Sequence, residues 1–203
     1  IRDRTSPISF QSDVNDPVDL RVSTVGRIQP HCEVKIVEDD GSTCAIGQRG
    51  ELWTKGYLVM KGYWNETEAT KSSIENGWMK TGDLATIDNE GFCRIVGRKK
   101  DMVIRGGENI YPAELEEFLA AQRGILEAHV FGIPDEKFGE QLVAWIIVEE
   151  GATLDETSIQ NLCKNALAYY KVPAIVRFVK EVPLTATGKP QKFKMREIML
   201  NET

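Results

Sequence analysis

Residues 97–116 read GRKKDMVIRGGENIYPAELE, and this stretch is the most informative part of the chain. Its first five residues, 97–101, include three consecutive cations, Arg98-Lys99-Lys100, and are too polar to lie inside a strand. The apolar run 102–104 predicts a short strand, and the glycine pair at 106–107 predicts a break after it. Pro112 suits the first turn of a helix, because an N–H group at that position has no hydrogen-bond partner within the helix and proline lacks this group. We therefore expect a charged linker, a strand, a glycine loop and a helix start.

Composition narrows the class of protein. The chain has 203 residues, enough for one large domain or two small ones with a real core. A hydrophobic content of 41% with 28% charge is ordinary for a soluble globular protein. The net charge of -6 argues against nucleic acid as a partner. No apolar run has the length of a membrane span, so we expect no stable membrane insertion.

The metal-binding residue types are few and scattered. Four cysteines share no short spacing, and only two histidines, His31 and His129, are present. We therefore expect no metal site within this chain and read both histidines as structural. The cysteines are expected to be reduced and mostly buried, as in an intracellular protein.

The hydrophobic pattern changes at 98–101, where we place the boundary between two parts, 1–99 and 100–203. Residues 1–20 lack periodicity and are expected to form a loop. Asn65 followed by Glu68 predicts a capping pair for a short helix through Ile74. Period-2 alternation or short apolar runs predict strands over 32–37, 50–54, 83–87, 92–96, 128–131, 142–148 and 175–179. Helices are expected from Pro112, over 159–170 and over 192–200, so the predicted class is α+β.

Two motifs have the residue types that chemistry on a nucleotide requires. In Thr81-Gly82-Asp83 the carboxylate can accept from both hydroxyls of a ribose, and Gly82 permits close backbone approach. The guanidinium group of Arg98 is rigid and planar, and its N–H donors suit sugar hydroxyls or phosphate. The competing interpretation of Thr81-Gly82-Asp83 is a turn that opens a hairpin, and that of Arg98 is a solvated surface arginine.

The second motif is the stretch 183–189, PLTATGK. Proline and glycine fix a loop, and the ammonium group of Lys189 is a mobile point charge that can be delivered into a closed site. An ordinary surface turn is the alternative for this loop taken alone.

With the stretch 97–116, these motifs resemble the AMP-forming acyl-CoA synthetases, part of the adenylate-forming superfamily. The resemblance covers about residues 22–203 and is closest to medium-chain fatty-acid ligases of the acyl-CoA synthetase family member 2 type. It implies that residues 1–99 form the β-rich last part of a large amino-terminal domain. Residues 100–203 would form a small, mobile carboxy-terminal lid. The complete enzyme would join a fatty acid or other carboxylic acid to CoA, using ATP and passing through an acyl-adenylate.

The resemblance also assigns roles to single residues. Asp83 and Arg98 would hold the ribose of ATP or AMP, and Lys189 would contact ATP and assist adenylation as the catalytic residue. Lys100 would be the hinge pivot. Gly106, Gly107 and Glu108 would line the tunnel through which CoA enters. Four further cations either meet the phosphates of CoA or form an ordinary solvated face: Lys171, Lys192, Lys194 and Arg196.

The chain also departs from the family. It contains no Ser/Thr/Gly-rich phosphate loop, and Arg2-Asp3-Arg4 stand where the family has a Thr-Glu pair for magnesium-ATP. We therefore expect the Mg²⁺ ligands outside this chain and expect the 203 residues alone to be inactive. The alternatives are a non-catalytic fragment or binding module, an adenylation domain that loads a carrier protein, and a luciferase-like enzyme. The resemblance suggests the mitochondrial matrix, although this chain shows no targeting segment; acyl chain length and oligomeric state are not predicted.

Overall fold

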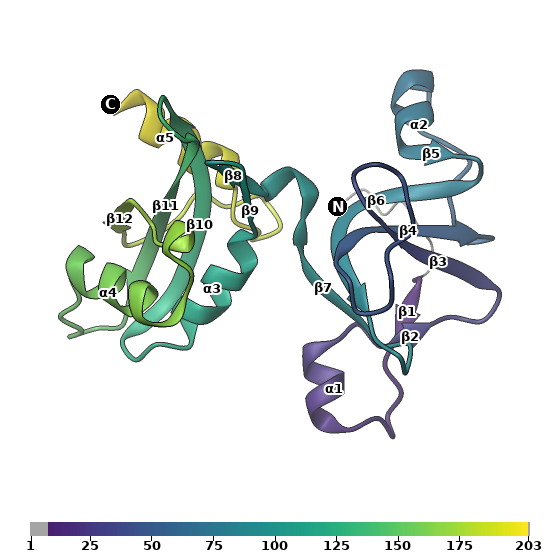
Figure 1. The fold of residues 1–203 in the computed structure, drawn as a ribbon, viewed down its shortest axis with the longest axis horizontal. Coiled ribbons are helices and arrows are strands. Elements are labelled where there is room, and N and C mark those ends of the chain that lie inside the picture. The colour runs from purple at the N-terminus through teal and green to yellow at the C-terminus, as the bar shows by residue number, and fades with distance from the viewer. Residues whose placement is uncertain (1–7, 203) are drawn as a thin grey trace. The chain divides into compact units, whose positions relative to one another are not determined.

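The computed structural model describes residues 8–202, and the chain forms two compact units, Ile1–Lys100 and Asp101–Thr203. Each unit has its own antiparallel or mixed sheet with helices (Figure 1), which confirms the predicted α+β class. The division lies one residue after the expected one. The identity of the units, as the end of a larger domain and a mobile lid, stays a prediction.

The first unit is built on a five-stranded antiparallel sheet. Four strands follow one another in the order β3 (Cys32–Val37), β4 (Gly50–Gly56), β6 (Trp78–Ile87) and β5 (Ile74–Glu75). The fifth, β7 (Cys93–Arg98), forms a hairpin with β6. Ile36, Leu52, Ala85 and Cys93 form a buried cluster on this sheet, since alternate residues of each strand point to the same face.

Strand β6 carries a bulge. Against β4, Glu51 pairs with Leu84 and Trp53 pairs with Lys80, so residues 81–83 together face a single residue of β4. The β6–β7 ladder also shifts, between Leu84 and the next residue. The Thr-Gly-Asp motif therefore lies inside a long strand and not at a turn that opens a hairpin. A bulge of this kind bends a strand and redirects a side chain.

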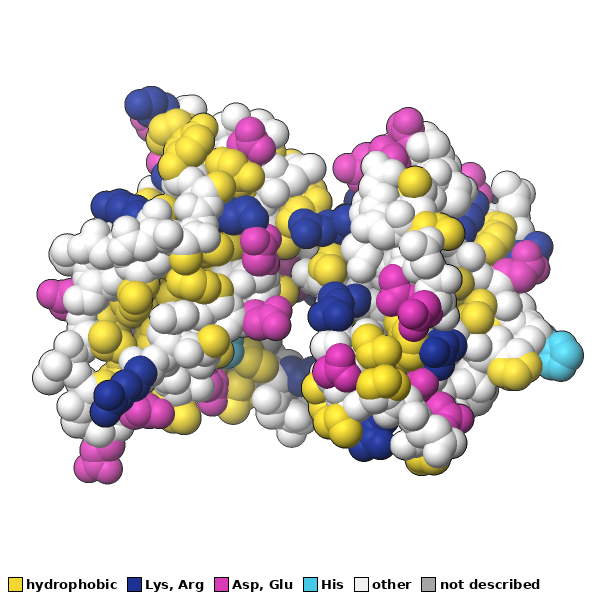
Figure 2. Space-filling view, turned by 60° about the horizontal axis from the view of Figure 1, so that its bottom comes forward, with side chains coloured by type: hydrophobic (Ala, Val, Ile, Leu, Met, Phe, Trp, Pro, Cys, Tyr) yellow, Lys and Arg dark blue, Asp and Glu magenta, His cyan; other side chains and the backbone are white. Residues whose placement is uncertain are grey.

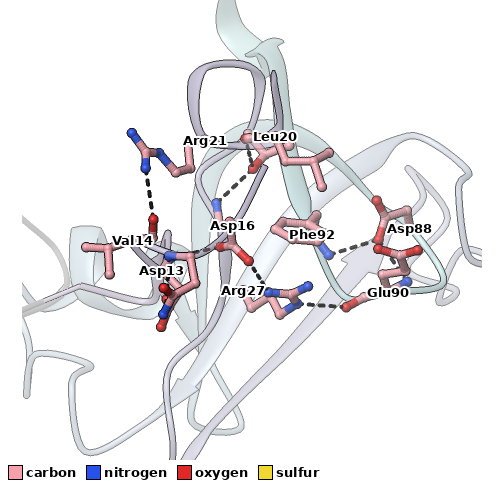
Figure 3. Close-up of polar contacts among 12 residues, drawn as sticks. Asp13, Val14, Asp16, Leu20, Arg21, Arg27, Asp88, Glu90 and Phe92 are labelled. Atoms are coloured by element: carbon pink, nitrogen blue, oxygen red, sulfur yellow. Dashed lines mark hydrogen bonds and ion pairs between the residues drawn. The ribbon is translucent and has the colours of Figure 1, made fainter. Parts of the chain in front are cut away.

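The first described segment is more ordered than the sequence predicts. Residues 8–20 were expected to be a loop, but β1 (Phe10–Gln11) pairs with β2 (Arg27–Ile28), and α1 (Val18–Ser23) lies between them in the chain. Arg27 fixes this segment to the β6–β7 hairpin (Figure 3). It lies 2.7 Å from Asp16, donates to the carbonyl of Glu90 at 3.2 Å, and stacks 3.7 Å above the Phe92 ring. The expected loop over 1–7 lies outside the described residues.

The second unit has a sheet with helices on both faces (Figure 1). Its centre is the hairpin of β10 (Ile125–Asp135) and β11 (Gly139–Val148), with β12 (Ile175–Phe178) parallel to β11. A second hairpin, β8 (Val103–Arg105) and β9 (Glu108–Ile110), joins the edge of β11. One face packs on α3 (Pro112–Ala120) and α4 (Glu156–Ala166), and the other on α5 (Lys192–Asn201). Both faces are apolar because β10 and β11 are covered on both sides.

Two helix predictions need correction. Helix α2 (Thr67–Ser73) is capped at Glu66 without a side-chain hydrogen bond, so the expected Asn65 cap is wrong. Asn65 has φ of +56° and belongs to the preceding turn. Helix α4 is shorter than predicted: it ends at Ala166, and a 3₁₀ turn, η2 (Tyr169–Lys171), follows. The apolar spacing continued past the helix because both elements pack on the same core.

Candidate functional site

Asp83 and Arg98 lie next to each other although they come from different motifs. They are paired across the β6–β7 ladder, and Arg98 Nε lies 2.8 Å from Asp83 Oδ1. The side chains are 27% exposed for Asp83 and 53% exposed for Arg98. A surface carboxylate and guanidinium held together in this way can accept from, and donate to, the hydroxyls of a sugar.

The bulge that carries Asp83 is held by side chains of its own strand and of β4. Gly82 has φ of +75°, and its N–H donates to Glu51 Oε1 at 3.2 Å. Thr81 Oγ1 donates to the carbonyl of Leu52 at 2.7 Å and accepts from the N–H of Asp83 at 3.1 Å. These bonds replace the ladder bonds that a bulge interrupts. Sequence analysis missed Glu51; its only signal is a carboxylate near the start of β4, directly before the apolar pair Leu52-Trp53.

The predicted hinge forms a single 3₁₀ turn, η1 (Lys99–Asp101), directly after β7. Lys100 is exposed, as a pivot requires. Lys99, by contrast, is anchored to the first unit: its Nζ lies 2.9 Å from Asp39 Oδ1 and 3.4 Å from Glu51 Oε2. The hydrogen bond to Asp39, with support from Glu51, raises the pKa of Lys99. Two adjacent lysines that look equivalent in sequence therefore differ in their surroundings.

The glycine pair expected to line the CoA tunnel forms a tight turn between two strands. Gly106 and Gly107 have φ of +60° and +88° and connect β8 to β9. Two consecutive positive φ angles suit a two-residue hairpin turn, which explains the glycines. The expected strand-to-helix turn is therefore wrong, because β9 intervenes before α3 begins at Pro112. Gly106, Gly107 and Glu108 are all exposed.

Lys189 lies on a loop of the second unit that is closed by its own hydrogen bonds. The N–H of Thr185 donates to the carbonyl of Lys189 at 2.8 Å, and the N–H of Lys189 donates to Thr185 Oγ1 at 3.0 Å. A tight turn, from the N–H of Gly188 to the carbonyl of Thr185, lies inside this loop. The backbone is thus ordered while the Lys189 side chain is exposed. Lys189 belongs to the second unit, and Asp83 and Arg98 belong to the first.

Three of the four cations considered for CoA phosphates have carboxylate partners. Lys171 contacts Glu114, Lys192 contacts Glu116, and Arg196 contacts Glu140. The first pair joins η2 to α3, the second joins α5 to α3, and only the third joins a helix, α5, to the sheet at β11. These cations therefore form more than a solvated face; Lys194 is exposed. On the face drawn in Figure 2, lysines and arginines are interspersed with acidic side chains.

No metal site or membrane span is found in the described part of the chain. Within residues 8–202, no group of three or more His, Cys, Asp and Glu residues could hold a metal ion. None of the helices in that range is both long and apolar enough to cross a membrane.

Comparison with known families finds matches to two separate segments of the chain. The AMP-binding enzyme family matches residues 5–64, and the family described as the AMP-binding enzyme C-terminal domain matches residues 114–189. The second match ends at Lys189. Asp83, Arg98 and Lys100 lie between the two matched segments.

Known proteins similar to this chain agree with these matches. YngI of Bacillus subtilis, an acyl-CoA synthetase by its assigned name, is 50% identical over 95% of this chain and 35% of its own length. The mitochondrial medium-chain acyl-CoA ligase ACSF2 of Rattus norvegicus is 45% identical over 96% of this chain and 32% of its own. ATP-bound MatB from Rhodopseudomonas palustris superposes with a TM-score of 0.83 at 38% identity, over 87% of this chain and 35% of that one. The chain spans about a third of the length of the relatives it matches.

Proposed function

The chain is homologous to acyl-CoA synthetases and contains segments of AMP-binding enzymes, and we propose that the complete protein is an AMP-forming fatty-acid–CoA ligase. The observation that carries this proposal is the Asp83–Arg98 pair. The two residues come from separate motifs, and the β6 bulge presents them together at the surface. Carboxylate and guanidinium groups in this arrangement suit the ribose hydroxyls of ATP and AMP.

The reaction that we propose joins a carboxylate to the α-phosphate of ATP, which releases pyrophosphate and forms an acyl-adenylate. The thiol of CoA then attacks the acyl carbon, the thioester forms, and AMP leaves. Two negatively charged groups must meet in the first step, and Lys189 is the residue that offsets their repulsion. Stabilisation of developing charge by one placed donor typically contributes about 10²–10³ in rate. The self-closed loop supports this role because it fixes the backbone of Lys189 while its ammonium group stays exposed.

The second step uses other residues in our proposal. Lys100 is the pivot about which the lid turns, and its exposed position in a short 3₁₀ turn is compatible with a change of backbone angles. Gly106, Gly107 and Glu108 then line the entry of CoA, where the two glycines allow a ligand to approach the backbone closely. Lys171, Lys192, Lys194 and Arg196 are less suited to phosphate than we expected, because three of them are neutralised by carboxylates. Mg²⁺ would be held by residues outside this chain.

Medium-chain fatty acids are the proposed substrates, after the name of the rat relative. The relatives support a cellular location for the protein less directly, since one named relative is mitochondrial and another is bacterial. We propose an intracellular location, where ATP and CoA are available, with the mitochondrial matrix as the specific case.

The test uses the complete protein with octanoate, ATP and CoA, and measures AMP and octanoyl-CoA. Arg98→Met should raise the KM for ATP by about tenfold, since a hydrogen bond to a charged donor is lost. Arg94→Met is the matched control: it is an exposed arginine of the same strand that contacts Ser23. Equal effects of the two variants, or no octanoyl-CoA from the wild type, would contradict the proposal.

A further inference from the structure

Glu51 is a buried carboxylate with two different partners, one in each of the regions that the proposed function uses. The residue is 8% exposed, although its side chain is a carboxylate. We propose that Glu51 is a positioning residue for the nucleotide site: its side chain holds the ribose-binding bulge and anchors Lys99, the residue before the pivot Lys100. This inference rests on the proposed function, because it takes Asp83 as the ribose ligand and Lys100 as the pivot.

The first contact explains how the bulge keeps its shape. Gly82 lies where three residues of β6 face one residue of β4, so a regular ladder bond is interrupted there. Its N–H instead donates to Glu51 Oε1 at 3.2 Å. A partly buried N–H that loses its acceptor is destabilised, and this would drive the peptide to reorient. Reorientation of Gly82 would move Asp83, the next residue, away from Arg98.

The second contact concerns the hinge. Glu51 Oε2 lies 3.4 Å from Lys99 Nζ, which also lies 2.9 Å from Asp39 Oδ1. A carboxylate as buried as that of Glu51 needs a cation or several donors, and Lys99 is its charged partner. The chain is thus tied to the first sheet up to Lys99. A change of backbone angles that moves the second unit is then confined to Lys100 and the residues after it.

The two oxygens of one side chain therefore link the ribose site to the start of the hinge. Removing the acceptor should affect nucleotide binding through Gly82. Removing only the charge should affect the hinge through Lys99 and leave the bulge in place. The two effects can be separated by choice of substitution, because glutamine keeps an oxygen for Gly82 and lacks the charge.

The experiment uses the complete protein and four variants. Glu51→Met removes the acceptor at similar volume, Glu51→Gln keeps it, and Lys99→Met removes the cation. Lys55→Met is the matched control, since Lys55 is an ion-paired lysine on the same sheet with the same exposure: 41% against 42% for Lys99. AMP binding is measured by calorimetry, and acyl-adenylate formation and thioester formation are measured separately. Thermal unfolding of each variant shows that it is folded.

We expect Glu51→Met to weaken AMP binding by about tenfold, as the loss of one buried hydrogen bond implies. Glu51→Gln should stay within about threefold of the wild type for AMP. Both Glu51→Gln and Lys99→Met should slow thioester formation by about tenfold with adenylate formation nearly unchanged, and Lys55→Met should change neither. This pattern requires specific contacts, because a general loss of stability would affect AMP binding in all folded variants alike.

Equal AMP affinity of folded Glu51→Met and wild type would overturn the role at the bulge. Unchanged thioester formation in Lys99→Met would overturn the role at the hinge. If Glu51→Met does not fold, Glu51→Ala replaces it. The AMP affinity of Glu51→Ala is then compared with that of Glu51→Gln to test the role at the bulge. A wild type that binds AMP but forms no acyl-CoA would count against the proposed ligase function alone, since AMP binding tests the bulge independently.

Discussion

Gly82→Ala tests whether the backbone of the β6 bulge positions the nucleotide site. Gly82 has φ of +75°, and a Cβ added there would meet no atom within 4 Å. The substitution therefore creates no clash, and its cost is the left-handed backbone conformation itself, about 1–2 kcal/mol. Gly91 is the matched control. It has φ of +83° and equally open surroundings, but it lies in the β6–β7 hairpin turn.

Both variants of the complete protein should lose the same free energy of unfolding, about 1–2 kcal/mol, measured by denaturant titration. Only Gly82→Ala should weaken AMP binding, because relaxation of its backbone displaces Asp83. A factor of ten corresponds to 1.4 kcal/mol, so we expect a loss of up to about tenfold by calorimetry. Equal AMP affinities for Gly82→Ala and Gly91→Ala, with equal losses of stability, would show that the bulge does not set the position of Asp83.

Four further outcomes follow from the fold and the site. Lys189→Ala should slow acyl-adenylate formation by about 10²–10³ and leave thioester formation from presynthesised acyl-adenylate within roughly tenfold; equal losses would refute a specific role. Lys100→Pro should suppress thioester formation while adenylation and thermal stability are retained, because proline fixes φ at the pivot; a wild-type rate of thioester formation would exclude Lys100. The 203-residue chain alone should release no pyrophosphate from ATP and octanoate, and saturable release would contradict our placement of the remaining ATP ligands outside it. Burial raises the pKa of Cys93 to about 12, above its unfolded value, so the stability due to the neutral thiol is complete below about pH 8.5 and is lost as the pH rises toward 12. In urea titrations, the free energy of unfolding of the wild type should fall more between pH 8 and pH 10.5 than that of Cys93→Ala. An equal dependence of this free energy on pH in the two proteins would contradict the prediction.

The sequence predicted the strands and the motifs better than it predicted how the motifs are held. Alternation located β3 and β4 well, since polar and apolar residues alternate over much of each strand. The bulge in β6 could not be predicted, because it depends on the pairing of β4 with β6, and pairing is not visible in one strand's pattern. For the same reason Glu51 escaped notice: its role depends on Gly82 and Lys99, which are distant in sequence.

Capping and turns account for most of the other differences. Asn65 has the side chain of a helix cap but a left-handed backbone, so it closes the preceding turn instead. The Gly106–Gly107 pair was read correctly as a break, yet the strand that follows it is only three residues long and has little pattern of its own. Short elements such as β9 are fixed by pairing with a neighbour rather than by their own sequence.

The buried clusters described above have a consequence for folding. Ile36, Leu52, Ala85 and Cys93 come from the first unit alone, and both clusters on the β10–β11 hairpin come from the second unit alone. Cooperative unfolding extends only as far as shared packing, so each unit can melt as a separate transition in calorimetry. A core substitution in one unit then leaves the other transition in place. Both clusters on the β10–β11 hairpin are formed by residues 101–203, and this segment is therefore a natural one to exchange between relatives of this chain.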